Sequence, residues 1–296
     1  MSGAPVIKLL DADRNTEVAV FGAIWVNAPS ALYVEQVQRI EQFERGDGVR
    51  LTKRFSDPPS LDDLAALNIS DQDLEDLREC QVGDCALKLD AGALQRLRTE
   101  MDWQHPLSKA EASAILRQLA LEYVRGYRAR GNAGLAVYRD QEPPTDVANE
   151  FRSLIGRLPW LATQLPDLQG YLLDYPQAVL PNSTDFLYWQ EAQFGLKPTV
   201  RINHLIIQER PGSKVVASKL LYSSHYFRTA LEVRVLLDDP ARGRGFWLTT
   251  VNRSRCDGLS GFKGRIIGAR VRSEARNATR AALTAVKAKL EARSGD

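Results

Sequence analysis

Tyr222, His225 and Arg228 are the residues of this chain best placed to move protons. They lie close together in the segment Tyr222-Ser223-Ser224-His225-Tyr226-Phe227-Arg228. A histidine that faces a cavity can act as a general base, because neutral imidazole is poised near pH 7. The alternative is that His225 is a partly buried structural histidine. The sequence leaves both interpretations open.

Other patterns typical of active sites are not found in the sequence. His105, His204 and His225 are far apart, and none belongs to a spaced metal-ligand motif. No Gly-x-Ser-x-Gly elbow is present, and Cys256 has no histidine near it in sequence. We therefore expect no metal and no cofactor. Whether the protein is an enzyme stays uncertain, with a non-catalytic protein favoured.

The spacing of Cys80 and Cys85 would allow a small disulfide loop, since Gly83 between them permits a tight turn. Two reduced structural thiols are the alternative. A disulfide would indicate an oxidising compartment. Residues 1–5 lack the regions of a signal peptide, although one could have been removed. We expect a soluble protein, periplasmic or secreted if a signal was removed and the cysteines are oxidised, and otherwise cytoplasmic.

Charge is distributed unevenly along the chain. The net charge is +2, yet residues 197–296 hold 20 basic and 8 acidic residues, leaving 19 and 29 in the first 196. Such asymmetry favours an anionic partner, for example a membrane surface, or two halves that pack together. No RNA-binding signature or DNA-recognition helix is present, so we expect no nucleic-acid partner.

The order of the predicted elements indicates an α+β fold. A strand over 17–26, a helix over 30–43 and a strand from 49 precede acidic, leucine-rich helical segments between 60 and 180. Period-two patterns then predict an antiparallel meander. Its strands are expected at 186–194, 199–209, 214–226, 229–237 and 246–253. A helix beginning at Leu259 or Ile266 and ending at Arg293 closes the chain.

The closing helix must bury an apolar stripe against the sheet. Alternating steps of four and three residues predict that this stripe consists of Val271, Ala275, Ala278, Ala282, Val286 and Leu290. Half of these are alanines, and small side chains facing a wide sheet can leave an apolar cavity for a ligand. Alternatively, large strand residues such as Trp189, Phe227 and Trp247 fill that space.

Two segments resemble the START-like superfamily of polyketide cyclases and lipid-transport proteins, also called the SRPBCC or helix-grip fold. They are Phe21-Gly22-Ala23-Ile24-Trp25-Val26-Asn27-Ala28-Pro29-Ser30 with its following helix, and the strands with the helix Ala269–Arg293. The resemblance implies one domain over 1–296, with its core at 17–56 and 184–293. In that fold a curved antiparallel sheet wraps around the C-terminal helix, and residues 60–180 would be a helical insertion.

This resemblance implies a protein that binds, and could transport, a hydrophobic ligand such as a lipid, a sterol-like or a polycyclic molecule. The ligand would lie between the sheet and the C-terminal helix. The candidate ligand-binding residues are Tyr188, Trp189, His204, Tyr222, His225, Phe227, Trp247, Ala275, Ala278 and Ala282. Two alternatives stay open: a cyclase, aromatase or hydratase using Tyr222, His225 and Arg228, and an interaction module that docks a partner through residues 60–180.

Overall fold

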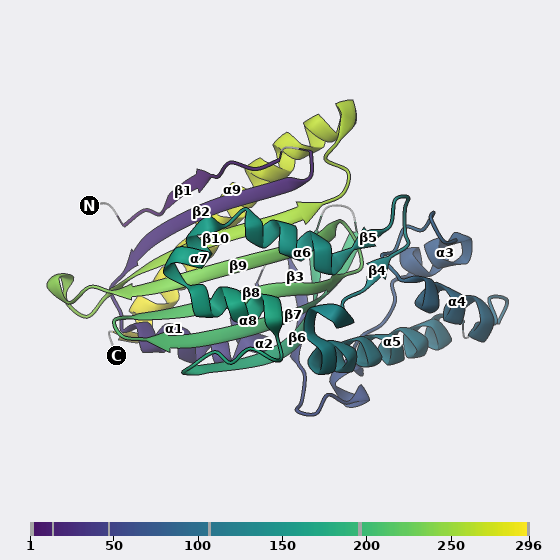
Figure 1. Cartoon of the computed structure of the whole chain (residues 1–296), viewed down its shortest axis with the longest axis horizontal. Coiled ribbons are helices and arrows are strands. Elements are labelled where there is room, and N and C mark those ends of the chain that lie inside the picture. The colour runs from purple at the N-terminus through teal and green to yellow at the C-terminus, as the bar shows by residue number, and fades with distance from the viewer. Residues whose placement is uncertain (1–2, 14, 47, 106–107, 195–196, 295–296) are drawn as a thin grey trace.

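An antiparallel sheet of eight strands forms the centre of the computed structural model, which describes residues 3–13, 15–46, 48–105, 108–194 and 197–294 (Figure 1). The order of the strands across the sheet is β1-β2-β10-β9-β8-β7-β6-β3. Their bounds are β1 Val6–Leu9, β2 Glu17–Val26, β3 Val49–Arg54, β6 Ser183–Phe194, β7 Lys197–Arg210, β8 Ser213–Ser223, β9 Phe227–Asp238 and β10 Phe246–Cys256.

Strands β6 to β10 form the predicted meander, because each pairs with the next one along the chain. Their alternating pattern places one set of apolar side chains on each face of the sheet. Leu205 and Ile207 of β7 belong to the core on one face, and Ile206 to the core on the other. The α+β class and the antiparallel meander predicted from the sequence are confirmed.

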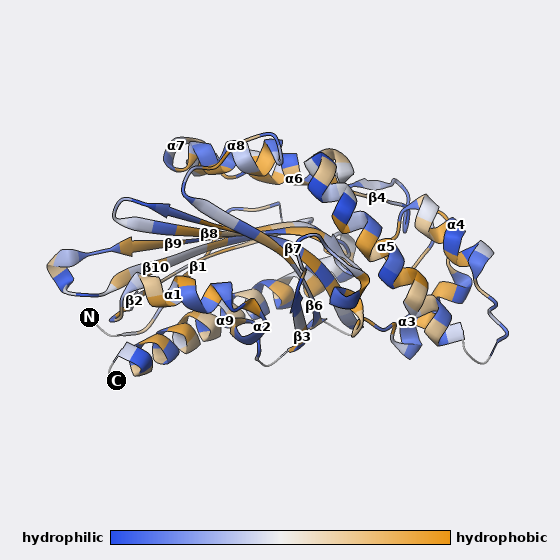
Figure 2. Cartoon of the chain, turned by 90° about the horizontal axis from the view of Figure 1, so that it is seen from below, coloured by the Kyte–Doolittle hydropathy of each residue, from blue (hydrophilic) through white to orange (hydrophobic). Residues whose placement is uncertain are grey.

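Helices cover both faces of the sheet (Figure 2). On one face lie α1, α2 and the long helix α9, and on the other lie α6, α7 and α8, which we call the face helices. Apolar side chains from each set pack against the strands, which buries both sides of the sheet. The bounds are α1 Ser30–Gln38, α2 Ile40–Phe43, α6 Val147–Gly156, α7 Pro159–Gln164, α8 Pro166–Asp174 and α9 Gly261–Ser294.

A second group of helices lies at one end of the sheet (Figure 1). These end helices are α3 Asp71–Glu79, α4 Ala91–Glu100 and α5 Ser108–Arg130, and the short 3-10 helix η1 Leu61–Leu64 precedes them. They share an apolar core of their own, while α5 and η1 also pack on β6, β7 and β8. Residues 60–180 therefore divide between the end helices and the face helices.

The side of α9 that faces the sheet differs from the predicted stripe. Ala278 and Ala282 are exposed, so the prediction that they face the sheet is wrong. Thr279 and Leu283 face it instead, because Gly22 of β2 leaves room for them. A Cβ atom at Gly22 would lie 2.7 Å from a methyl of Leu283 and 2.9 Å from the methyl of Thr279. One glycine on the partner strand thus sets the rotation of α9.

A buried ion-pair network joins the end helices to the sheet. Lys88, whose side chain is 3% exposed, follows α3 in the chain and forms ion pairs with Asp140, at 2.9 Å, and with Asp257, just after β10. Arg228 of β9 pairs with Asp257 at 2.5 Å. Burial alone would raise the pKa of Asp257, but Lys88 and Arg228 hold it below its usual range.

None of the described helices combines the length and the apolar composition that crossing a bilayer would require.

Candidate functional site

An apolar cavity of about 120 Å³ lies between the end helices and the sheet. Helix α5 contributes one wall, and β6, β7 and β8 form the opposite wall. The loop before α4 and the short strand β4 (Val137–Tyr138) close its sides. Among its lining residues are Leu87, Leu89, Leu116, Leu119, Ala120, Tyr123, Tyr138, Trp189, Ile202 and Tyr222.

Three tyrosines line one part of the cavity. Tyr222 of β8 lies between Tyr123 and Tyr138, with ring centroids 6.0 and 6.1 Å away and the rings edge to face. The Tyr123 hydroxyl donates a hydrogen bond of 2.6 Å to the carbonyl of Leu221. Burial raises the pKa of all three phenols, so they stay neutral at physiological pH. This wall therefore offers aromatic edges and no charge.

Trp189 of β6 is a second aromatic residue in the cavity wall, and its side chain is fully buried. Its indole Nε1 donates a hydrogen bond of 2.9 Å to the carbonyl of Asp63 in η1. The polar end of the indole is thereby satisfied, and the ring is fixed against the end helices. Of the predicted ligand-binding residues, Trp189 and Tyr222 line this cavity.

Polar side chains in the cavity wall already have protein partners. Asp90 caps α4 by accepting from the backbone of Ala93 at 2.8 Å. Ser113 donates to the carbonyl of Lys109 at 2.8 Å, and Ser224 accepts from the backbone of Val200 at 3.0 Å. These groups support the surrounding structure, which leaves the interior of the cavity to apolar contacts.

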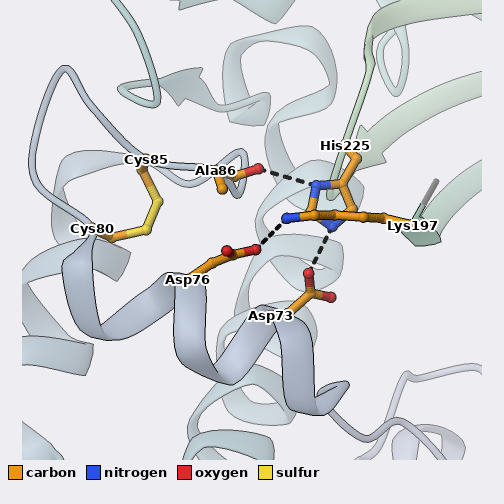
Figure 3. The surroundings of a disulfide bond; sticks show 7 residues. All are labelled: Asp73, Asp76, Cys80, Cys85, Ala86, Lys197 and His225. Atoms are coloured by element: carbon orange, nitrogen blue, oxygen red, sulfur yellow. Dashed lines mark hydrogen bonds and ion pairs between the residues drawn. A yellow bond between two sulfur atoms is a disulfide. The ribbon is translucent and has the colours of Figure 1, made fainter. Parts of the chain in front are cut away.

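His225 lies beside the cavity wall and not in the cavity. Its Nε2 lies 3.1 Å from Asp73, and its Nδ1 lies 3.0 Å from the carbonyl of Ala86 (Figure 3). Both ring nitrogens of His225 therefore already have partners within the protein. This geometry supports the structural interpretation of His225.

Arg228 also points away from the cavity, toward Asp257 and toward Glu150 of α6, the latter at 3.7 Å. Of the three residues considered for proton transfer, only Tyr222 lines the cavity. The structure therefore does not bring Tyr222, His225 and Arg228 together around one reacting atom, as general acid–base catalysis requires.

His204 belongs to a separate buried cluster where α5, the face helices and the sheet meet. Its Nδ1 lies 3.0 Å from the Tyr127 hydroxyl, and its Nε2 lies 3.4 Å from Asp185. Burial lowers the pKa of His204, although Asp185 opposes that effect. Lys219 lies in the same cluster and is fully buried. Sequence reasoning missed Lys219, because a lysine on a strand is usually exposed.

The other predicted ligand-binding residues are spread over the molecule. Tyr188 lines a small polar hollow of about 80 Å³ together with Glu44, Arg201, Glu232 and Arg234. This hollow is on the sheet face that carries α9, where the sequence predicted an apolar cavity. Phe227 and Ala275 pack against a buried cluster that includes Val18, Cys256 and Leu259. Trp247 packs edge to face on Trp25, with Arg242 over its ring.

Cys80 and Cys85 form a disulfide at the end of α3 (Figure 3). The backbone between them turns at Gly83, whose φ is +89°. Leu87 and Leu89, which line the cavity, follow directly after this loop. The third cysteine, Cys256, is buried, and burial raises the pKa of its thiol to about 12.

We expect loss of the disulfide to destabilise the protein by roughly 2 kcal/mol, because a short closed loop restricts the unfolded chain. The double variant Cys80→Ala/Cys85→Ala and the wild type in reductant should both show this change. Urea unfolding followed by circular dichroism measures it. An unfolding free energy that is the same with and without reductant would contradict the expectation.

The chain matches no protein-family model and no curated protein.

Proposed function

We propose that this protein binds a small hydrophobic ligand in the cavity between α5 and strands β6 to β8. The observation that carries the proposal is the wall itself, which combines leucines, three neutral tyrosines and Trp189 with polar groups that already have partners. Filling a largely apolar cavity with an apolar ligand is favourable, because apolar surface is removed from water.

The size of the cavity narrows the ligand class. About 120 Å³ is close to the engineered apolar cavity of about 150 Å³ that accepts benzene. Drug-sized ligands occupy pockets of roughly 300–1,000 Å³. We therefore propose a ligand with one aromatic or aliphatic ring, or one end of a longer chain. A sterol-like or polycyclic ligand would require the end helices to move outward from the sheet.

We also propose that the sheet and α9 form a divergent helix-grip domain and that residues 60–180 are an insertion into it. The order of the elements and the packing of α9 on β2 support this proposal. In this interpretation the end helices, and not α9, provide the ligand cavity. Binding is favoured over catalysis because only Tyr222 of the three residues considered for proton transfer lines the cavity.

Toluene tests the cavity directly, since it is apolar and close to the cavity in size. We expect saturation-transfer NMR to detect toluene binding to the wild type. Ala120→Phe should abolish the signal, because Ala120 lines the cavity and a phenyl ring there occupies the space. Ala114→Phe is the matched control, since Ala114 lies on the same helix and is exposed. It should bind toluene as the wild type does.

Equal toluene signals from Ala120→Phe and the wild type would show that this cavity is not the binding site. Native mass spectrometry of the purified protein adds an independent measurement. A retained small molecule that is missing from folded Ala120→Phe would identify the ligand by its mass. Circular dichroism of each variant establishes that the fold is kept.

A further inference from the structure

The first turns of α9 carry an exposed apolar surface with basic residues around it. Phe262 is 76% exposed, Ile266 64% and Ile267 50%. Large apolar side chains with this exposure on adjacent positions of one helix are unusual for a surface in contact only with water. Figure 1 shows the start of α9 extending beyond the outline of the sheet. We call Phe262, Ile266 and Ile267 the apolar tip.

The opposite side of the same turns is fixed against the protein. Gly264 is buried, and a Cβ atom there would lie 2.5 Å from the carbonyl carbon of Leu259. Leu259 is itself buried in a cluster with Val18 and Cys256. Because Gly264 holds the helix closely against this cluster, α9 cannot turn to bury Phe262 and Ile266. The apolar tip therefore stays directed outward.

The helix segment that carries the apolar tip is rich in basic residues. Residues 258–273 contain four basic residues, Lys263, Arg265, Arg270 and Arg272, and no acidic residue. Lys263 and Arg265 flank the side of the helix on which Phe262 and Ile266 lie one turn apart. Long basic side chains beside an apolar strip can reach lipid headgroups while the apolar residues enter the acyl boundary.

We propose that the start of α9 docks this protein onto an anionic lipid surface. Phe262 and Ile266 enter the interface, and Lys263 and Arg265 contact the negatively charged headgroups. Charge complementarity favours this partner, because each basic residue near an anionic bilayer adds to the binding. The proposal does not depend on the ligand cavity, which is formed by other elements.

Sedimentation with vesicles tests this surface. We expect the full chain to bind vesicles of phosphatidylcholine with phosphatidylglycerol, and to bind much more weakly to phosphatidylcholine alone. Phe262→Ser/Ile266→Ser should weaken binding at least tenfold. Lys263→Gln/Arg265→Gln should weaken it by about tenfold or more and reduce its dependence on salt. Val179→Ser is the control, since Val179 is 84% exposed and lies elsewhere.

Two results would overturn the proposal. One is that the wild type binds both vesicle types equally, or that Phe262→Ser/Ile266→Ser binds vesicles as strongly as the wild type does. The other is a wild type that binds no vesicles and self-associates in analytical ultracentrifugation, while Phe262→Ser/Ile266→Ser is a monomer. The apolar tip would then be covered by a second copy of the chain. Circular dichroism establishes that each variant is folded.

Discussion

Replacing Lys88 with methionine is expected to destabilise the protein by about 3–5 kcal/mol. The ammonium of Lys88 lies between the carboxylates of Asp140 and Asp257, whose side chains are only 10% and 21% exposed. Without it, two like charges face each other in a poorly hydrated site. Removing one partner of a buried ion pair is costly because the remaining charge is left without compensation. Urea unfolding of Lys88→Met against the wild type measures the loss.

The exposed pair Arg270–Glu274 provides a matched control on α9. Its side chains are 82% and 60% exposed, so Arg270→Met should leave the unfolding free energy nearly unchanged. Asp257 keeps its ion pair with Arg228, so adding Asp140→Asn to Lys88→Met removes the less compensated carboxylate and should recover part of the stability. A cost for Lys88→Met no larger than that for Arg270→Met would show that the network contributes little.

Raising the pH from 7 to 9 is expected to stabilise the protein by up to about 2 kcal/mol. Burial lowers the pKa of Lys219 from 10.5 to about 7. Between these values the unfolded chain binds more protons than the folded chain does, so the unfolding free energy rises with pH. This gain in unfolding free energy is an upper value, because the ring faces of Phe151 and Tyr127 attract the ammonium form of Lys219.

Other buried groups titrate mainly outside this window. The folded pKa of His204 is lowered from 6.5, so its stabilising contribution is largely complete by pH 7. The pKa of Cys256 is raised from 9.0 to about 12, and those of Tyr127 and Tyr171 are raised from 10.0. These three groups reduce stability, mainly above pH 9. The window from 7 to 9 therefore reports chiefly on Lys219.

The variant Lys219→Met should flatten the dependence of stability on pH between 7 and 9. Lys8→Met is the control, since Lys8 is exposed on β1 and should leave the slope unchanged. Thermal unfolding at pH 7, 8 and 9 gives the slope for each protein. If the stability of Lys219→Met depends on pH as steeply as that of the wild type, another group is responsible.

The sheet and its helices could be predicted from the sequence because their patterns are local. Strands with alternating apolar residues, such as β7 and β9, were found to within a few residues. Helix α5, Ser108–Arg130, lies in the region where the sequence predicts helical segments. Tyr123 and Tyr127 lie one turn apart on this helix, where Tyr123 lines the cavity and Tyr127 is fully buried.

The rotation of α9 and the place of the cavity depend on contacts distant in sequence. Alanines fit either face of a helix, so the stripe through Ala278 and Ala282 was indistinguishable from the true one. Gly22, more than 250 residues earlier in the chain, decides between them. Likewise the cavity joins Leu87, Tyr123 and Tyr222 from three separate segments. The apolar residues of 60–180 predict a packed core. They do not indicate which strands that core would contact.

The burial of Cys256 has a consequence for the chemistry of the disulfide. Thiol–disulfide exchange requires a thiolate that can reach a sulfur atom, and the Cys256 thiol is both buried and held in its protonated form. In the folded protein the Cys256 thiol therefore cannot attack the Cys80–Cys85 bond and rearrange it. Cys256 will react with alkylating reagents only in molecules that have opened around it. The rate at which Cys256 is alkylated consequently reports how readily the protein opens around it.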